Sequence, residues 1–129
     1  MRWCSYRARW QGAEYEASPD PRADRVWIRL RGTAPAEGFE ELAPGRFVRP
    51  VPAEECEAVV FVATVGEWRG VPCLVRDERD GELLVEYTGG RMPVARELGF
   101  ARVERGVYQA WVLRGEVTGL REHAVPLDF

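Results

Sequence analysis

The sequence contains no lysine and no asparagine, a single isoleucine (Ile28) and a single histidine (His123). The lack of lysine excludes a phosphate-binding loop that ends in Gly-Lys-Ser/Thr, and one histidine makes a His-based metal centre or a Cys–His nucleophile pair unexpected. Lys, Asn and Ile have AT-rich codons, so their shortage predicts a high-GC bacterial source. All 18 basic residues are arginine, which either reflects the same codon bias or indicates a phosphate-binding surface. We favour codon bias, because 21 acidic residues outnumber the arginines and the sequence contains no basic run.

Long apolar runs and paired cysteines are also missing. No stretch approaches the roughly 18 continuous apolar residues of a membrane helix, and the first residues lack the apolar core of a signal peptide. Cys4, Cys56 and Cys73 are odd in number and never closer than 17 positions, which fits neither a disulfide framework nor a zinc cluster with two-residue spacers. We therefore expect a cytoplasmic protein with buried free thiols, no cofactor, no metal and no membrane contact.

The composition is that of an ordinary folded protein. The 129 residues are 46% apolar and 30% charged, with a formal net charge of -3. A chain of this length buries roughly two thirds of its unfolded surface on folding. We expect it to fold without a partner, because it has none of the composition of a disordered chain.

An internal repeat is the most informative pattern. Trp10-Gln11-Gly12 matches Trp68-Arg69-Gly70 at a shift of 58 residues, and Gly38-Phe39 matches Gly99-Phe100 at a shift of 61. This ordered series predicts a duplicated unit of roughly 60 residues, with four extra residues in the second copy near residues 90–98. Further matched pairs are Arg22 with Arg79 and Gly32 with Gly89 at a shift of 57, and Gly45 with Gly106, Phe47 with Tyr108, Val51 with Val112 and Glu55 with Glu116 at 61.

Both copies show the two-residue alternation that is typical of strands. In the first copy, apolar and polar residues alternate over residues 4–10 and again over residues 26–30. Pro93 can begin, and Gly99 can end, a short helix over residues 93–98. The pattern predicts an all-β protein with two tandem small barrels, the first over residues 1–59 and the second over residues 60–120, followed by a tail at residues 121–129.

Each copy resembles a small Src-homology-3-like or Tudor-like barrel. The resemblance rests on four or five short strands, a tight first hairpin at Gln11-Gly12, and a closing segment at residues 51–55. It lacks the long acidic first loop and paired-Trp platform of the peptide-binding subset, and no aromatic cage for methyl-lysine can be assembled. The resemblance implies a scaffold for protein or nucleic-acid contacts. One continuous barrel or sandwich built from both copies is the alternative fold.

Several large apolar residues are predicted on the outward side of the strands. If the alternating apolar residues of 26–30 face the core, Trp27 and its aligned partner Leu84 point outward. Trp3 and Phe61 form a second matched outward pair. Exposed apolar surface usually marks a contact, so these residues either pack one copy against the other or meet a partner.

The candidate partner-binding residues are three tryptophans and one acidic turn. Trp3 and Trp111 are predicted to stay free for a partner, because large aromatic side chains anchor interfaces. The acidic turn would complement a basic cleft on a partner protein and speed the encounter. The complete candidate set is Trp3, Trp27, Trp111, Asp77, Glu78 and Asp80.

The sequence predicts no catalytic set. The carboxylates at Glu40-Glu41, Glu54-Glu55 and Asp77–Asp80 lie in predicted loops, where solvated charge is the ordinary state. We expect a non-catalytic protein that binds another protein, for example an immunity protein or inhibitor that sequesters a bacterial toxin or enzyme. A structural or regulatory subunit of an enzyme complex remains open as an alternative.

A nucleic-acid-associated module is a further alternative, and it is less favoured. The net charge is negative, and no basic stripe with interleaved aromatic residues is present. The arginines that would have to gather for such a role are Arg22, Arg25, Arg29, Arg31, Arg46 and Arg49.

Overall fold

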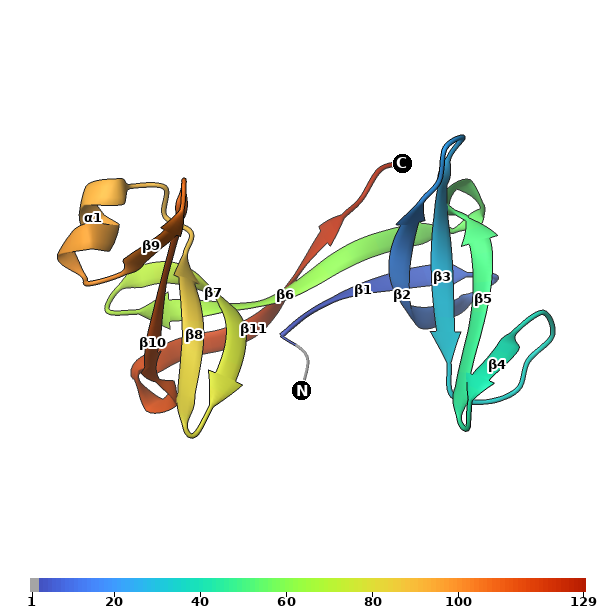
Figure 1. Cartoon of the computed structure of the whole chain (residues 1–129), viewed down its shortest axis with the longest axis horizontal. Coiled ribbons are helices and arrows are strands. Elements are labelled where there is room, and N and C mark those ends of the chain that lie inside the picture. Colours follow the sequence, from blue (N-terminus) through green and yellow to red (C-terminus); the bar gives the residue numbers. More distant parts are fainter. Residues whose placement is uncertain (1–2) are drawn as a thin grey trace. The chain divides into compact units, whose positions relative to one another are not determined.

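The computed structural model describes residues 3–129. In chain order the elements are β1 (Cys4–Trp10), β2 (Ala13–Pro21), β3 (Val26–Gly32), β4 (Glu40–Ala43), β5 (Arg46–Pro52), η1 (Ala53–Glu55), β6 (Ala58–Trp68), β7 (Val71–Arg79), β8 (Glu82–Tyr87), α1 (Met92–Glu97), β9 (Ala101–Glu104), β10 (Val107–Leu113), η2 (Arg114–Glu116) and β11 (Val117–Pro126). The predicted all-β class is confirmed, and α1 is the short predicted helix (Figure 1). None of the helices in the described part of the chain has the length and apolar character needed to cross a membrane.

The strands form one antiparallel sheet. Their order is β4-β5-β3-β2-β1-β6-β7-β8-β10-β9, and β11 pairs with β6 beside this series. Neighbours in the sheet are mostly neighbours in the chain, since tight hairpins join β1 to β2, β6 to β7 and β7 to β8. The terminal strands of the order are therefore β4 and β9.

The same series of elements occurs twice along the chain. Five strands and a 3-10 turn, β1 to β5 with η1, are followed by β6 to β10 with η2. The first hairpin turns agree closely, because Gln11 and Arg69 both have φ 48° and the glycines after them both have φ 78°. Left-handed backbone of this kind favours glycine, which explains why glycine recurs at the turns. Two further matched glycine pairs also have positive φ, namely Gly38 with Gly99 and Gly45 with Gly106.

The register of the third strand differs from the sequence prediction. Ile28 on β3 pairs with Val51 on β5, whereas Leu83 on β8 pairs with Val112 on β10. Because Val51 and Val112 are a matched pair, Ile28 corresponds to Leu83, at a shift of 55 rather than 57. The predicted match of Trp27 with Leu84 is therefore wrong by two residues.

A shorter turn in the second copy is the cause. Residues 22–25 connect β2 to β3, but only Asp80 and Gly81 connect β7 to β8. Between Trp68 and Leu83 the second copy has three residues fewer than the first, two of them at this turn, and it gains six, rather than the predicted four, before Gly99. The added residues form α1 and the segments beside it (Figure 1).

At one pair of neighbouring strand positions, the tyrosine and the small residue are exchanged between the two copies. In the second copy Cys73 on β7 pairs with Tyr87 on β8, and the corresponding residues of the first copy are Tyr15 and Gly32. Each copy thus has one large ring and one small residue at these two positions. Tyr15 stacks on Phe39, with ring centroids 5.6 Å apart, and Tyr87 lies 5.7 Å from the matched ring, that of Phe100. The exchange keeps one large ring beside the matched phenylalanine in each copy.

The chain folds into two compact units. Within the described residues, the N-terminal unit comprises Ser5–Val62 and Ala124–Phe129, and the C-terminal unit comprises Trp3, Cys4 and Ala63–His123. The fully buried core of the first centres on Ile28 and Leu30, and that of the second on Val75, Leu83 and Val85. The units thus meet along the chain inside β6, a few residues beyond the predicted boundary at residues 59 and 60.

The predicted C-terminal tail is part of the sheet. β11 extends over Val117–Pro126, and beyond it the backbone N–H of Leu127 donates to the carbonyl oxygen of Val59 at 2.9 Å. Leu127 also packs against the core of the N-terminal unit. Residues 121–129 therefore connect the C-terminal unit back to the N-terminal one along the chain.

Trp3 is a core residue, and the prediction that it stays at the surface is wrong. Its side chain is 7% exposed and belongs to the apolar cluster of the C-terminal unit, together with Trp68 and Tyr87. The carbonyl oxygen of Trp3 accepts a hydrogen bond from the backbone N–H of Thr64 at 2.8 Å. This contact holds the beginning of the chain against the first residues of the C-terminal unit, which sequence spacing alone does not indicate.

The three cysteines are free thiols, and Cys73 is the buried one. Burial raises the pKa of the Cys73 thiol from 9.0 to about 11, and the charge of Glu67 adds to this, against a smaller opposing effect of the Trp68 backbone. Its pKa in the folded state therefore lies above its value in the unfolded state. The thiol's contribution to the free energy of unfolding is complete below pH 9 and is lost as the pH rises toward 11.

We therefore expect the stability difference between the wild-type protein and Cys73→Ala to depend on pH. The wild-type protein should lose free energy of unfolding relative to the variant as the pH is raised between these two values. Urea denaturation curves of both proteins, measured on either side of this range, test the expectation. A difference that stays constant with pH would contradict it.

Candidate binding site

Trp27 lies on β3 and is half-buried. The guanidinium carbons of Arg22 and Arg25 lie 4.5 and 4.8 Å from the centre of its ring. Arg22 pairs with Asp20 at 3.2 Å and Arg25 with Glu54 at 2.9 Å. The ring is covered by side chains of its own unit, which gives this outward tryptophan a structural role through cation–π contacts.

The predicted acidic turn lies at the end of β7, in the C-terminal unit. Asp80 has φ 36° and precedes Gly81, so it occupies the first central position of a two-residue hairpin turn. The Asp77 carboxylate accepts the backbone N–H of Glu78 at 2.8 Å, and Glu78 pairs with Arg114 at 3.1 Å. Two of the three predicted carboxylates thus have partners within the unit.

Trp111 lies on β10 and is half-buried. The guanidinium carbon of Arg79 lies 4.0 Å from the centre of the Trp111 ring, and Arg79 also pairs with Glu82 at 3.2 Å. Trp111 thus shares one end of the C-terminal unit with the acidic turn, whereas Trp27 belongs to the other unit. The structure brings Trp111, Asp77, Glu78 and Asp80 together, and it does not bring Trp27 to them.

One ion pair in the C-terminal unit is more sheltered than the others. Arg76 pairs with Glu86 at 3.2 Å, and the side-chain amide of Gln109 donates to the same carboxylate at 3.0 Å. Partial burial raises the pKa of Glu86, but the hydrogen bonds from Arg76 and Gln109 outweigh it, so the pKa lies below its usual value. This network joins β7, β8 and β10, and it is charged and satisfied rather than poised for proton transfer.

Metal ligands and buried acid–base groups do not gather in the described part of the chain. Within residues 3–129, no group of three His, Cys, Asp or Glu side chains comes together as metal ligands would. The buried set among the same residues contains no polar or charged side chain. Glu86 is the partly buried carboxylate described above, and its hydrogen bonds from Arg76 and Gln109 hold its pKa below the range of a general acid.

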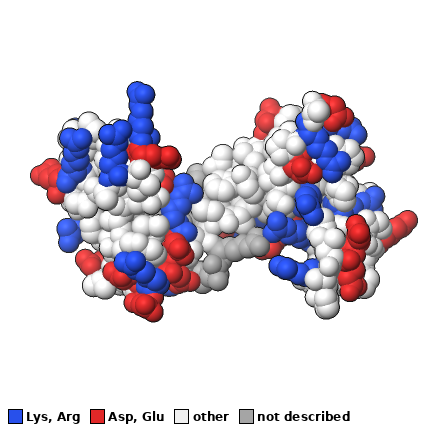
Figure 2. Space-filling view, viewed as in Figure 1, with Lys and Arg blue, Asp and Glu red and all other residues white. Residues whose placement is uncertain are grey.

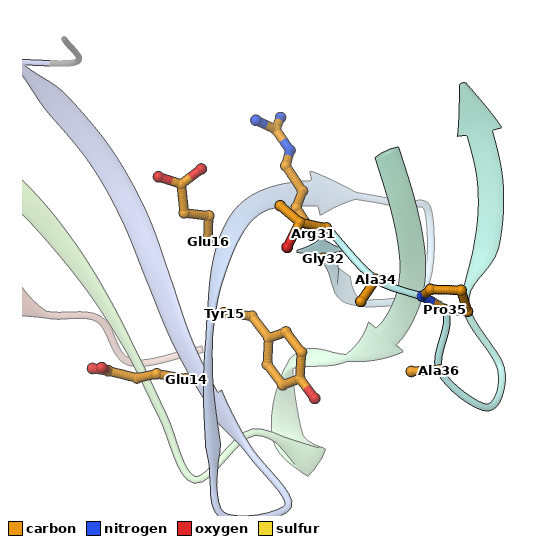
Figure 3. Close-up of a pocket in the computed structure, with 9 residues that line it drawn as sticks. Glu14, Tyr15, Glu16, Arg31, Gly32, Ala34, Pro35 and Ala36 are labelled. Atoms are coloured by element: carbon orange, nitrogen blue, oxygen red, sulfur yellow. The ribbon is translucent and has the colours of Figure 1, made fainter. Parts of the chain in front are cut away.

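A hollow of about 430 Å³ lies beside Tyr15 in the N-terminal unit. In Figure 3 the Tyr15 ring points toward the loop of Ala34, Pro35 and Ala36, while the carboxylates of Glu14 and Glu16 point away from it. The hollow lies where the second copy has the larger Tyr87 and the longer segment that includes α1. Its charged groups do not converge, so it presents no focused chemistry to a ligand.

A second hollow, of about 390 Å³, lies in the C-terminal unit beside α1 and β9. Arg102 belongs to β9, Arg105 to the turn after it, and Arg91 precedes α1. We call this site the arginine hollow. It is lined by Tyr87, Gly90, Arg91, Met92, Arg102, Arg105, Gly106 and Tyr108. Figure 2 shows arginine side chains projecting from the end of this unit where Figure 1 draws α1 and β9.

The three arginines of the hollow differ from the ion-paired arginines of the same unit. Arg76, Arg79 and Arg114 each pair with a glutamate, whereas Arg91, Arg102 and Arg105 have no side-chain ion pair or hydrogen bond to any described residue. The hollow is ordered by its backbone instead, since the N–H of Arg91 donates to the Tyr87 hydroxyl at 3.3 Å. Three guanidinium groups thus border one open space with their donors unused.

Comparison with known proteins shows the family to which the chain belongs. A family model described as "Uncharacterised conserved protein UCP033725" matches residues 2–127. The chain belongs to this family. No curated protein and no solved structure matches the chain. The family's extent covers both halves, so the duplicated arrangement and the arginine hollow lie within the matched region.

Sequence reasoning did not select any residue of the arginine hollow. A signal was present in the aligned copies of this family member, because Arg102 matches Glu41 and Arg105 matches Pro44 at the shift of 61. Arg91 lies in the longer segment that the first copy lacks. The three arginines are thus a feature of the second copy alone, through two differences of residue and one insertion.

Proposed function

We propose that the protein is a non-catalytic binding protein that takes an acidic segment of another protein at the arginine hollow. The observation that carries this proposal is the set of three arginines, Arg91, Arg102 and Arg105, which border an open hollow without ion-pair partners among the described residues. A guanidinium group binds a carboxylate through two parallel hydrogen bonds. Three such groups around one space suit a ligand with several carboxylates.

Apolar surface beside the arginines supports a protein ligand. Met92 is 48% exposed and borders the hollow, whereas Tyr87 and Tyr108 form the buried part of its wall. Methionine side chains adapt to the surface of a protein partner. A segment that alternates acidic and apolar residues would use both kinds of group.

The charge distribution supports an acidic partner over a nucleic acid. The whole chain carries a formal charge of -3, so the basic hollow is a local feature on an acidic protein. Nucleic-acid binding relies on many phosphate contacts along a basic surface. Two of the arginines considered for that role, Arg22 and Arg25, are instead paired with carboxylates and stacked on Trp27.

The wider interpretation is sequestration of a partner protein in the cytoplasm, as an immunity protein or inhibitor would do, or as a subunit of an enzyme complex. Two small β-units of Src-homology-3-like or Tudor-like type would serve as the scaffold. The acidic turn around Glu78 is a weaker candidate surface, because Arg79 and Arg114 offset its charge. We therefore propose that the partner's main contact is with the basic arginine hollow and not with the acidic turn.

Binding of a labelled oligoglutamate peptide, followed by fluorescence anisotropy at low salt, tests the proposal. We expect Arg102→Gln/Arg105→Gln to weaken binding by about tenfold or more, which corresponds to one lost charge-assisted contact or more. Arg29→Gln/Arg46→Gln is the matched control, since it removes two exposed arginines from the other unit and should leave the affinity unchanged. Equal effects of both variants, or tighter binding of a single-stranded RNA than of the peptide, would overturn the proposal.

A further inference from the structure

The two ends of the sheet occupy equivalent places in the repeat. β4 and β9 are the terminal strands of the sheet order, and each is the fourth strand of its copy. All four residues of β9 are exposed, as are the first three of β4. A strand in this position offers its unused backbone N–H and C=O groups to another strand.

The two edges carry opposite charge. Acidic side chains gather at β4, and the arginines of the hollow gather at β9, as Figure 2 shows over both strands. One charge of the other sign is present at each edge, Arg46 near β4 and Glu104 on β9. The acidic residues at the first edge are Glu37, Glu40 and Glu41, and the basic residues at the second are Arg91, Arg102 and Arg105.

An exposed aliphatic side chain accompanies the charges on each edge. Leu42 on β4 is 55% exposed and Val103 on β9 is 60% exposed. These two residues match in the repeat at the shift of 61. Each edge therefore combines a free backbone, an apolar side chain and a net charge, and the two charges are complementary.

This distribution discriminates among the ways in which two copies can meet. Pairing of β9 with β9 would bring two edges of net positive charge together, and pairing of β4 with β4 would bring two edges of net negative charge together. Like charges opposite one another on paired strands are unfavourable, and opposite charges are favourable. Only the unlike pairing, β4 with β9, places an edge of net negative charge against an edge of net positive charge.

We propose that β4 of one copy pairs with β9 of a second copy, so that Glu40 and Glu41 face Arg102 and Arg105 and the chains associate head to tail. The inference rests on the proposed function, because it takes the second copy's β4 as an acidic segment bound at the arginine hollow. Self-association and binding of another acidic segment therefore exclude one another at this site. Each edge is only four residues long, so the association is weak and salt-sensitive.

Sedimentation velocity of the full chain tests the inference. At low salt the average mass should rise with concentration above the 14.7 kDa of one chain, and high salt should remove the rise. Glu40→Arg/Glu41→Arg and Arg102→Glu/Arg105→Glu should each abolish self-association, because each makes the two edges alike in charge. An equimolar mixture of the two variants should associate again, since it restores unlike edges. Circular dichroism spectra of both variants are the control that they are folded.

The outcomes separate this inference from the proposed function. A wild-type chain that stays at one mass over the whole concentration range, or a single-edge variant that associates as the wild type does, would overturn the head-to-tail contact. If such a chain still binds the oligoglutamate peptide through Arg102 and Arg105, the proposed function stands and only the second copy is excluded as the occupant. If peptide binding also fails, both are wrong.

Discussion

Replacement of Trp3 by alanine is expected to destabilise the C-terminal unit by ~3–5 kcal/mol, the usual loss when a buried tryptophan is truncated in a core. Trp3 is 7% exposed and packs in the cluster that contains Trp68, Tyr87 and Phe100. The surrounding core relaxes only partly into the space left by the indole ring, so a cavity remains. Urea denaturation followed by far-ultraviolet circular dichroism measures the loss.

Trp3→Phe is the matched control for this prediction. The indole N–H of Trp3 is buried and has no hydrogen-bond partner among the described residues. Phenylalanine keeps most of the apolar contact and removes this unsatisfied donor, so we expect a loss of only ~1 kcal/mol. Equal stability of Trp3→Ala and the wild-type protein would show that Trp3 lies at the surface, as sequence reasoning predicted.

Replacement of Gly66 by alanine is expected to lower the free energy of unfolding by ~1–3 kcal/mol, as overpacking in a close contact does. Gly66 is a buried residue of β6, and β11 passes directly over it. A Cβ atom at this position would lie 2.8 Å from the carbonyl oxygen of Thr118 and 3.1 Å from Cγ1 of Val117. The first of these is a backbone atom, so β11 itself has to move.

Gly115→Ala is the matched control, measured in the same denaturation assay. Gly115 lies in η2, just before β11, and a Cβ there would meet no atom within 4 Å. Its substitution should change stability by no more than ~0.5 kcal/mol, as expected for an open surface site. If both variants lose the same amount, close packing of β11 on β6 is not the reason that position 66 is glycine.

Local patterns in the sequence were sufficient to predict the all-β fold class. The alternation of apolar and polar residues located the strands, and the matched turn glycines located the boundaries between them, because positive φ at positions such as Gly45 and Gly106 leaves few other choices of residue. The short helix could be placed from Pro93 and Gly99 for the same local reason. These features depend on a few neighbouring residues, which is why one sequence sufficed.

The register and the ends of the chain depend on partners far away in sequence. Aligning the turns of the two copies could not show whether the third strand of the second copy is offset from that of the first by 57 or by 55 residues. The pairing of Leu83 with Val112 decides for 55, because the second copy has the shorter hairpin before its third strand. Trp3 and Leu127 were read as surface and tail for the same reason. Their contacts, with Thr64 and Val59 respectively, lie at sequence distances that no periodicity reports.

The candidate site escaped sequence reasoning for a different reason. Arg91, Arg102 and Arg105 were explained by codon bias and were not among the arginines considered for nucleic-acid binding, and nothing in the composition separates a paired arginine from an unpaired one. The structure makes that separation, because Arg76, Arg79 and Arg114 have glutamate partners and the three arginines of the hollow do not.

The division of β1, β6 and β11 between the two units has a consequence for any attempt to take the protein apart. The polypeptide passes from one unit to the other after Cys4, after Val62 and after His123. Neither half is a continuous piece of chain, so no single proteolytic cut liberates an intact half. A cleavage inside β6 would yield two fragments, each of which carries strand residues that the other requires, and the fragments would fold only by complementing one another.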